Sequence, residues 1–220
     1  MGRERGRIRT RFDKVQQAEA TEKIVNLQGS LYALLFDGYV EQKSIESALA
    51  YQSLIKSGVD KSQILFLKGD GTRSPDHRSA TLDNLELAVD SLKHIAKPDD
   101  RLLFYFASHG NVIDREYYFE SYDGIVWEKD LAQMMRGLSV NFSLFYFSQC
   151  YGGQFAERIG FGRNIGLSAV SRREKSWAHR GIGRYFTNNL FSKLLKDNVS
   201  IEQAFDWAAK EAINFFSWSK

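Results

Sequence analysis

Short apolar runs alternate along this chain with longer stretches in which apolar residues recur every three or four positions. Each apolar run predicts a buried strand, because strands of a parallel sheet are covered on both faces. The runs are 31–36, 64–67, 102–106, 142–147 and 165–170. The periodic stretches predict helices at 43–57, 81–96, 128–138, 186–196 and 200–216, with one more after Gly152-Gly153. This alternation predicts an α/β fold with a mostly parallel, doubly wound sheet and helices on both faces.

Two further patterns divide the chain. Residues 117–119 and 125–127, separated by Asp123-Gly124, predict a β-hairpin. The first eleven residues hold five arginines against Glu4, a net charge of +4, which leaves −1 for the rest of a chain whose total is +3. We therefore expect a basic arm or helical extension over 1–28 and one domain over 29–220. The nearly neutral domain gives no indication of nucleic-acid binding.

The composition limits the class of protein. A length of 220 residues with 43% hydrophobic and 26% charged residues is typical of one globular domain. The one cysteine excludes an internal disulfide, and with it a disulfide-stapled secreted domain. No apolar run approaches the roughly 18 residues of a membrane helix, and the start does not resemble a signal peptide. We expect a cytoplasmic protein that does not bind membranes.

Candidate chemistry lies where the third and fourth predicted strands end. The third strand is followed by His109-Gly110, and the fourth by Cys150 and then Gly152-Gly153. Ligand and catalytic groups gather at the carboxyl ends of parallel strands, and consecutive strands usually neighbour each other. The sequence therefore predicts that His109 and Cys150 lie side by side at one edge of the sheet.

A thiol and an imidazole in this arrangement point to nucleophilic catalysis. A nearby imidazole or helix amino terminus favours the thiolate, which is the nucleophilic form of cysteine. The N–H groups of Gly110 and Cys150 are candidates for an oxyanion hole, in which each donor contributes about 3 kcal/mol. Alone, the cysteine would be interpreted as a small buried hydrophobe and His109-Gly110 as a turn. Their occurrence at consecutive strand ends favours catalysis.

The two motifs, Tyr105-Phe-Ala-Ser-His109-Gly110 and Phe145-Tyr-Phe-Ser-Gln-Cys150-Tyr-Gly152-Gly153, resemble those of the caspase-like cysteine peptidases. The intervening hairpin and helix, and the segment Phe36-Asp37-Gly38-Tyr39, are similar to the legumain branch. The resemblance covers about residues 30–195. It implies a three-layer caspase-like sandwich with Cys150 as nucleophile and His109 as general acid and base.

The resemblance also implies a third group that orients the imidazole from the end of the first strand. Asp37 is the first candidate and Glu41 the second. An Asp-Gly turn explains Asp37 equally well without any catalytic role.

Further residues are implied in substrate binding. Ser148 corresponds to the base of the first side-chain pocket, while Ser176 and Trp177 resemble the strand that pairs with the substrate backbone. Ala178 stands where caspases carry an arginine, so a preference for aspartate before the scissile bond (position P1) is not expected. Asp37, Glu41 and Glu174 are candidates for binding a basic or amide side chain, and the sequence does not choose between them.

These features predict a cysteine endopeptidase with no cofactor and no metal. Its expected partners are a polypeptide substrate and an oligomeric or regulatory partner. Two alternatives remain open. A transamidase or ligase would use the same dyad with an amine in place of water, and a non-catalytic caspase-like adaptor would use the same edge for binding.

Overall fold

The computed structural model describes residues 24, 28–39, 45–69, 77–173, 175, 182–197 and 199–218. Within these ranges, six parallel strands form the central sheet. In spatial order they are β3 (Arg78–Ser79), β2 (Ile64–Lys68), β1 (Leu31–Asp37), β4 (Arg101–Ala107), β8 (Phe142–Phe147) and β9 (Asn164–Ser168). The predicted α/β class with a parallel sheet is confirmed. The two-residue β3 was not predicted, because so short a strand leaves no periodic signal.

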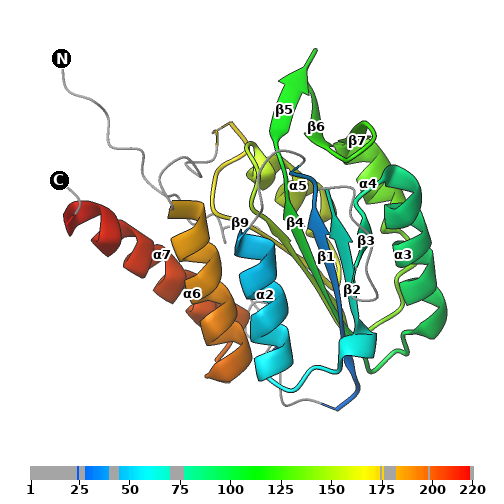
Figure 1. The fold of residues 1–220 in the computed structure, drawn as a ribbon, viewed down its shortest axis with the longest axis horizontal. Helices are drawn as coiled ribbons and strands as arrows, with labels where there is room; N and C mark the ends of the chain where they lie inside the picture. The colour runs from blue at the N-terminus through cyan, green and yellow to red at the C-terminus, as the bar shows by residue number, and fades with distance from the viewer. Residues whose placement is uncertain are drawn as a thin grey trace.

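Helices cover both faces of this sheet and give three layers (Figure 1). One face carries α2 (Ile45–Lys56), α6 (Ile182–Lys196) and α7 (Ile201–Trp218). The other carries α3 (Leu82–Ile95), α4 (Glu128–Met134) and α5 (Gly152–Ile159). A single 3₁₀ turn, η1 (Lys61–Gln63), leads into β2. The helix predicted over 128–138 ends earlier, at Met134, and Gly137 follows with a φ of 83°, a conformation that favours glycine and ends helices.

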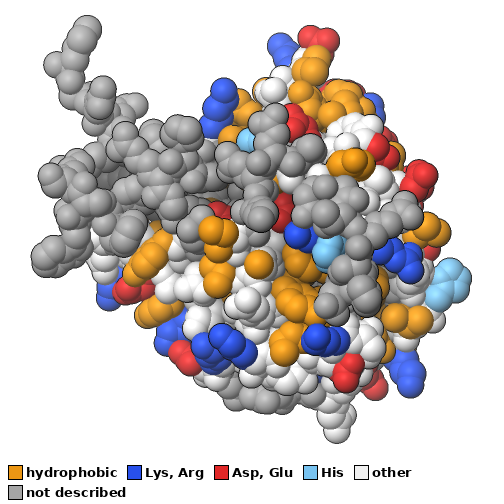
Figure 2. All heavy atoms as spheres, in the orientation of Figure 1, with side chains coloured by type: hydrophobic (Ala, Val, Ile, Leu, Met, Phe, Trp, Pro, Cys, Tyr) orange, Lys and Arg blue, Asp and Glu red, His pale blue; other side chains and the backbone are white. Residues whose placement is uncertain are grey.

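A second, smaller sheet rises above the carboxyl end of β4. It consists of three antiparallel strands, β5 (Gly110–Ile113), β6 (Glu116–Glu120) and β7 (Ile125–Trp127). The pairing of β6 with β7 confirms the predicted hairpin, whereas β5 was missed. Its turn, Asp114-Arg115, has φ values of 50° and 69° and lacks the glycine by which such turns are recognised. Figure 2 shows hydrophobic side chains gathered over this sheet, where Ile113 is 51% and Ile125 38% exposed.

A buried arginine attaches the segment before β1 to the start of β4. The guanidinium of Arg101 donates to the carbonyl of Ile24 at 2.6 Å and to that of Gly29 at 2.7 Å. The neighbouring Asp100 carboxylate accepts from the Ser30 N–H at 2.6 Å. Ile24 is itself fully buried, in the hydrophobic core on the face of the sheet that α2, α6 and α7 cover. The rest of the predicted arm, apart from Gln28, lies outside the described residues. In the described part of the chain, no helix combines the length and apolar character needed to cross a bilayer.

Candidate active site

The pairing of β4 with β8 brings the two candidate catalytic residues together. Each residue of β4 pairs with the residue 41 positions later in β8, up to Phe106 with Phe147. The N–H of Ser148 donates to the Phe106 carbonyl at 2.8 Å, which continues the pairing beyond the end of β8. His109 and Cys150 lie three residues past the last pair and are also 41 positions apart. They therefore emerge at the same edge of the sheet.

Gly110 allows the two strand ends to touch. A Cβ atom at this position would overlap the carbonyl oxygen of Cys150 and lie 3.1 Å from Cγ of Gln149. Only a residue without a side chain fits against the cysteine turn here. The backbone of Gly110 is thus adjacent to that of Cys150, as an oxyanion hole built from their two N–H groups requires.

Cys150 lies in a strained turn between β8 and α5. Its side chain is partly exposed. The next residue, Tyr151, has φ 59° and ψ 17°, a left-handed conformation that costs a non-glycine residue about 1–2 kcal/mol. The ring of Tyr151 packs on that of Tyr117 at 5.8 Å. Because α5 begins at Gly152, the thiol is close to the positive end of a helix dipole.

His109 is exposed, and its main chain is held by the small sheet. The His109 carbonyl accepts from the Glu120 N–H at 2.9 Å, while Ser108 Oγ donates to the Glu120 carbonyl at 2.6 Å. The imidazole contacts the ring of Tyr39 edge-on, with ring centres 4.9 Å apart and planes at 88°. A neighbouring strand end and the small sheet therefore both help to orient this residue.

Asp37 ends β1 and is only 2% exposed. Its carboxylate accepts from the Tyr39 N–H at 3.3 Å, which is the Asx geometry of an Asp-Gly turn. Asp37 also pairs in register with Ala107, two residues before His109. The turn thus fixes the backbone of Tyr39, the residue that contacts His109. The part assigned to Asp37 in orienting the imidazole stays a prediction.

Tyr39 is a site residue that the sequence did not assign. Burial raises the pKa of its phenol above the ordinary value of 10, and negative charges nearby raise it further, namely those of Glu46, Cys150, Asp37 and Glu120. The phenol therefore remains protonated, as a neutral donor within electrostatic range of the thiol. The sequence feature that could have identified Tyr39 is its position two residues after the end of the first predicted strand.

A second group missed from the sequence is Glu46, in the first turn of α2. The hydroxyl of Ser148 donates to Glu46 Oε2 at 3.0 Å, and the hydroxyl of Tyr105 donates to the same oxygen at 3.3 Å. Tyr105 stacks on Tyr146, whose hydroxyl lies 3.0 Å from Thr187 Oγ1. Burial, and then the charge of Glu46, raises the pKa of Tyr105, which keeps it a neutral donor. Ser148 is 5% exposed and thus lies beside a carboxylate, two residues before the thiol.

The remaining candidates for substrate binding lie outside the described residues. These are Glu41, Glu174, Ser176 and Trp177. Their assignments stay predictions.

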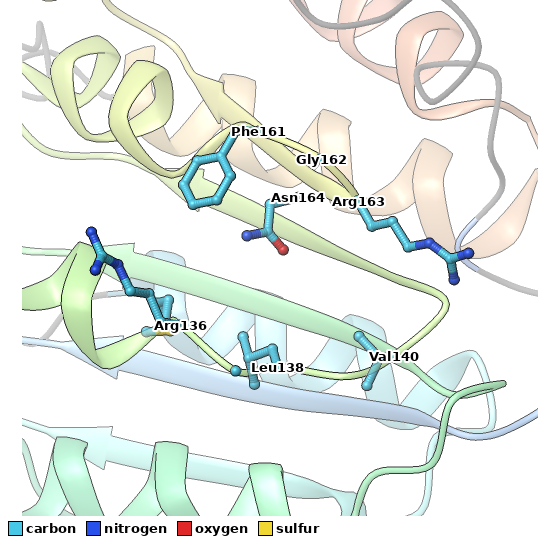
Figure 3. A pocket seen from close by; sticks show the side chains of 9 residues that line it. Arg136, Leu138, Val140, Phe161, Gly162, Arg163 and Asn164 are labelled. Carbon is cyan, nitrogen blue, oxygen red and sulfur yellow. The ribbon is translucent and has the colours of Figure 1, made fainter.

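A hollow of about 300 Å³ lies at the opposite edge of the sheet (Figure 3). It opens between the segment before β8 and the segment before β9, and Phe161, Leu138 and Arg136 are among its lining residues. Amino ends of parallel strands are not where such sheets bind substrates. Within the described ranges, no three of the His, Cys, Asp and Glu side chains form a group able to hold a metal ion.

The fold and the candidate site together form a parallel α/β sheet in which one central strand is followed by an imidazole and its neighbour by a thiol. No family model matches the chain, and no curated protein matches it either. The function must therefore be argued from the site itself.

Proposed function

We propose that this protein is a cysteine endopeptidase that uses Cys150 and His109. The observation that carries the proposal is the shared spacing of 41 residues, by which the β4–β8 register aligns the imidazole with the thiol. The adjacent backbone of Gly110 and the helix that begins at Gly152 support the same assignment. The resemblance of the two strand-end motifs to caspase-like peptidases agrees with it.

The reaction follows from the roles of these groups. The Cys150 thiolate attacks the carbonyl carbon of the scissile peptide bond, and the N–H groups of Gly110 and Cys150 stabilise the oxyanion. As the C–N bond breaks, His109 donates a proton to the leaving amine. His109 then takes a proton from water as the water oxygen attacks the thioester, and the C–S bond breaks to release the acid product and regenerate the thiolate and the protonated imidazole.

Ser148 and Glu46 bear on which side chain is accepted at P1. A hydroxyl and a carboxylate beside the thiol favour a basic or amide-bearing side chain, because these supply N–H donors. A P1 aspartate would bring a second negative charge toward Glu46. The proposed specificity is therefore for lysine, arginine or an amide.

The test is hydrolysis of a peptide library, together with labelling by an acyloxymethyl-ketone probe. We expect Cys150→Ala to abolish both, and His109→Ala to lower kcat/KM by about 10²–10⁴. His94→Ala is the matched control, since His94 is exposed at the carboxyl end of α3 and its ring contacts the Asp90 carbonyl of the same helix. Labelling that survives His109→Ala unchanged would contradict the dyad. Product analysis with an added amine separates hydrolysis from transamidation.

A further inference from the structure

β5 is an edge strand that begins at the candidate active site. In the described part of the chain it pairs only with β6, and its first residue, Gly110, directly follows His109. The other long side of β5 therefore presents backbone groups that no described strand covers. An edge of this kind is a template for adding a further strand.

The hydrogen-bond phase decides which residues of β5 present those groups. In antiparallel pairs, residues that bond to the partner alternate with residues that point away from it. The His109 carbonyl accepts from Glu120, so His109, Asn111 and Ile113 face β6. Gly110 and Val112 consequently point their N–H and C=O groups away from β6. Gly110 also contacts the Cys150 carbonyl, on the side where a Cβ atom would stand, so this edge begins beside the cysteine turn.

The outward N–H of Val112 is engaged in a way that a ligand can replace. It donates at 2.9 Å to Oδ1 of its own neighbour, the exposed Asn111. Local bonds of this type compete with strand pairing, and they leave an N–H satisfied until a better acceptor arrives. An incoming carbonyl would take this donor and release the Asn111 side chain to water.

We propose that β5 binds the substrate residues that follow the scissile bond, as an added parallel strand. The inference rests on the proposed function, because the leaving amine must lie at His109, where β5 begins. With the P1 carbonyl at the Gly110 N–H, parallel pairing brings both backbone groups of residue P2′ (the second after the scissile bond) onto the edge. The P2′ N–H donates to the Gly110 carbonyl, and the P2′ carbonyl accepts from Val112.

The proposal defines a substrate class. The enzyme prefers polypeptides that extend at least two residues past the scissile bond in an extended conformation. Proline at P2′ is disfavoured, because it has no N–H to donate.

The first experiment uses the native chain and paired peptides that differ only by N-methylation at P2′. We expect the methylated peptide to show about tenfold lower kcat/KM, since it loses one hydrogen bond and clashes at the edge. N-methylation at P3′, whose backbone groups point away from β5 in this register, is the control and should change the rate less than twofold. Equal rates for the P2′ pair would overturn the inference and leave the peptidase proposal standing. Absence of any Cys150-dependent cleavage would overturn both.

Two variants test the proposal independently. The quantity measured is the ratio of kcat/KM for a long substrate to kcat/KM for a substrate that ends in a dye amide directly after P1. Val112→Pro removes the outward N–H and should lower this ratio about tenfold. Asn111→Ala removes the competing acceptor and should raise it about two- to threefold, a gain that a purely structural role would not produce. Ile113→Ala is the control, since that backbone faces β6. An unchanged ratio in both test variants would contradict the proposal.

Discussion

The two faces of the β4–β8 strand pair differ in the polar side chains that they bury. Tyr105 and Tyr146 point to the face covered by α2, α6 and α7. The face covered by α3, α4 and α5 receives four phenylalanines of these strands, Phe104, Phe106, Phe145 and Phe147. On the phenylalanine face, Phe104 stacks on Phe145 at 4.5 Å and Phe106 on Phe147 at 5.1 Å. We call these the tyrosine face and the phenylalanine face.

On the tyrosine face, each buried hydroxyl described above has a partner. The chain of contacts runs from Thr187 through Tyr146 and Tyr105 to Glu46 and Ser148. It ends beside the candidate P1 pocket. The polar groups of this face therefore connect the core to the candidate active site.

Buried polar atoms without hydrogen-bond partners lie at both ends of β8. Ser143 Oγ is buried and makes no hydrogen bond, and neither does either polar atom of Gln149, which is 0% exposed. An unsatisfied buried group costs about 1–3 kcal/mol. Gln149 directly precedes Cys150, so the nucleophile turn combines this cost with the left-handed Tyr151. Near the site, Ser148 is held by a hydrogen bond to Glu46 of α2, whereas the nucleophile turn carries an unpartnered amide and a left-handed residue.

The largest effect on stability should come from Phe104→Ala. It removes a fully buried ring that stacks on Phe145, and we expect a loss of about 3–5 kcal/mol in the free energy of unfolding. Denaturant unfolding measures this loss. The matched change on the other face, Tyr105→Phe, keeps the ring volume and should cost much less. Similar losses for the two variants would contradict a packing role for one face and a polar role for the other.

Alkaline pH should test the tyrosine face next. Burial raises the pKa of Tyr105 and Tyr146 in the folded protein above the ordinary value of 10. Their contribution to the free energy of unfolding is complete below pH 10. It falls as the pH rises further, because the two phenols then ionise in the unfolded chain but not in the folded protein. The two together predict a loss of about 3 kcal/mol at pH 11. Urea unfolding from pH 9 to 11 measures this slope, and Tyr146→Phe should make it shallower.

The smallest expected effect is a gain in stability. Gln149→Met replaces an unpartnered amide by an apolar chain of similar length, and we expect stabilisation by about 1 kcal/mol. Thermal unfolding measures the shift, with Ser143→Ala as the matched change at the other end of β8. Destabilisation by Gln149→Met would mean that the amide makes a contact essential to the turn.

The sequence predicted the sheet and the meeting of His109 with Cys150 because both follow from apolar runs and parallel pairing. It did not predict β5, since its pattern is short and its turn lacks glycine. Tyr39 and Glu46 were not predicted as site residues for a different reason. Their importance depends on contacts with residues 59–102 positions away, such as Glu46 with Ser148, and no local sequence pattern indicates such contacts. Glu41, Glu174, Ser176 and Trp177 stay predictions.

The shared register of β4 and β8 has a consequence for evolution and design. The distance in sequence between imidazole and thiol is set by where two strands begin and end, and the hairpin and α4 between them add length without moving either strand end. Insertions at the Asp114-Arg115 turn or after Gly137 should therefore be tolerated by the dyad, whereas a one-residue slip inside β8 would turn the thiol to the opposite face. Searches for related chains should accordingly fix the two strand-end motifs and leave the length between them free.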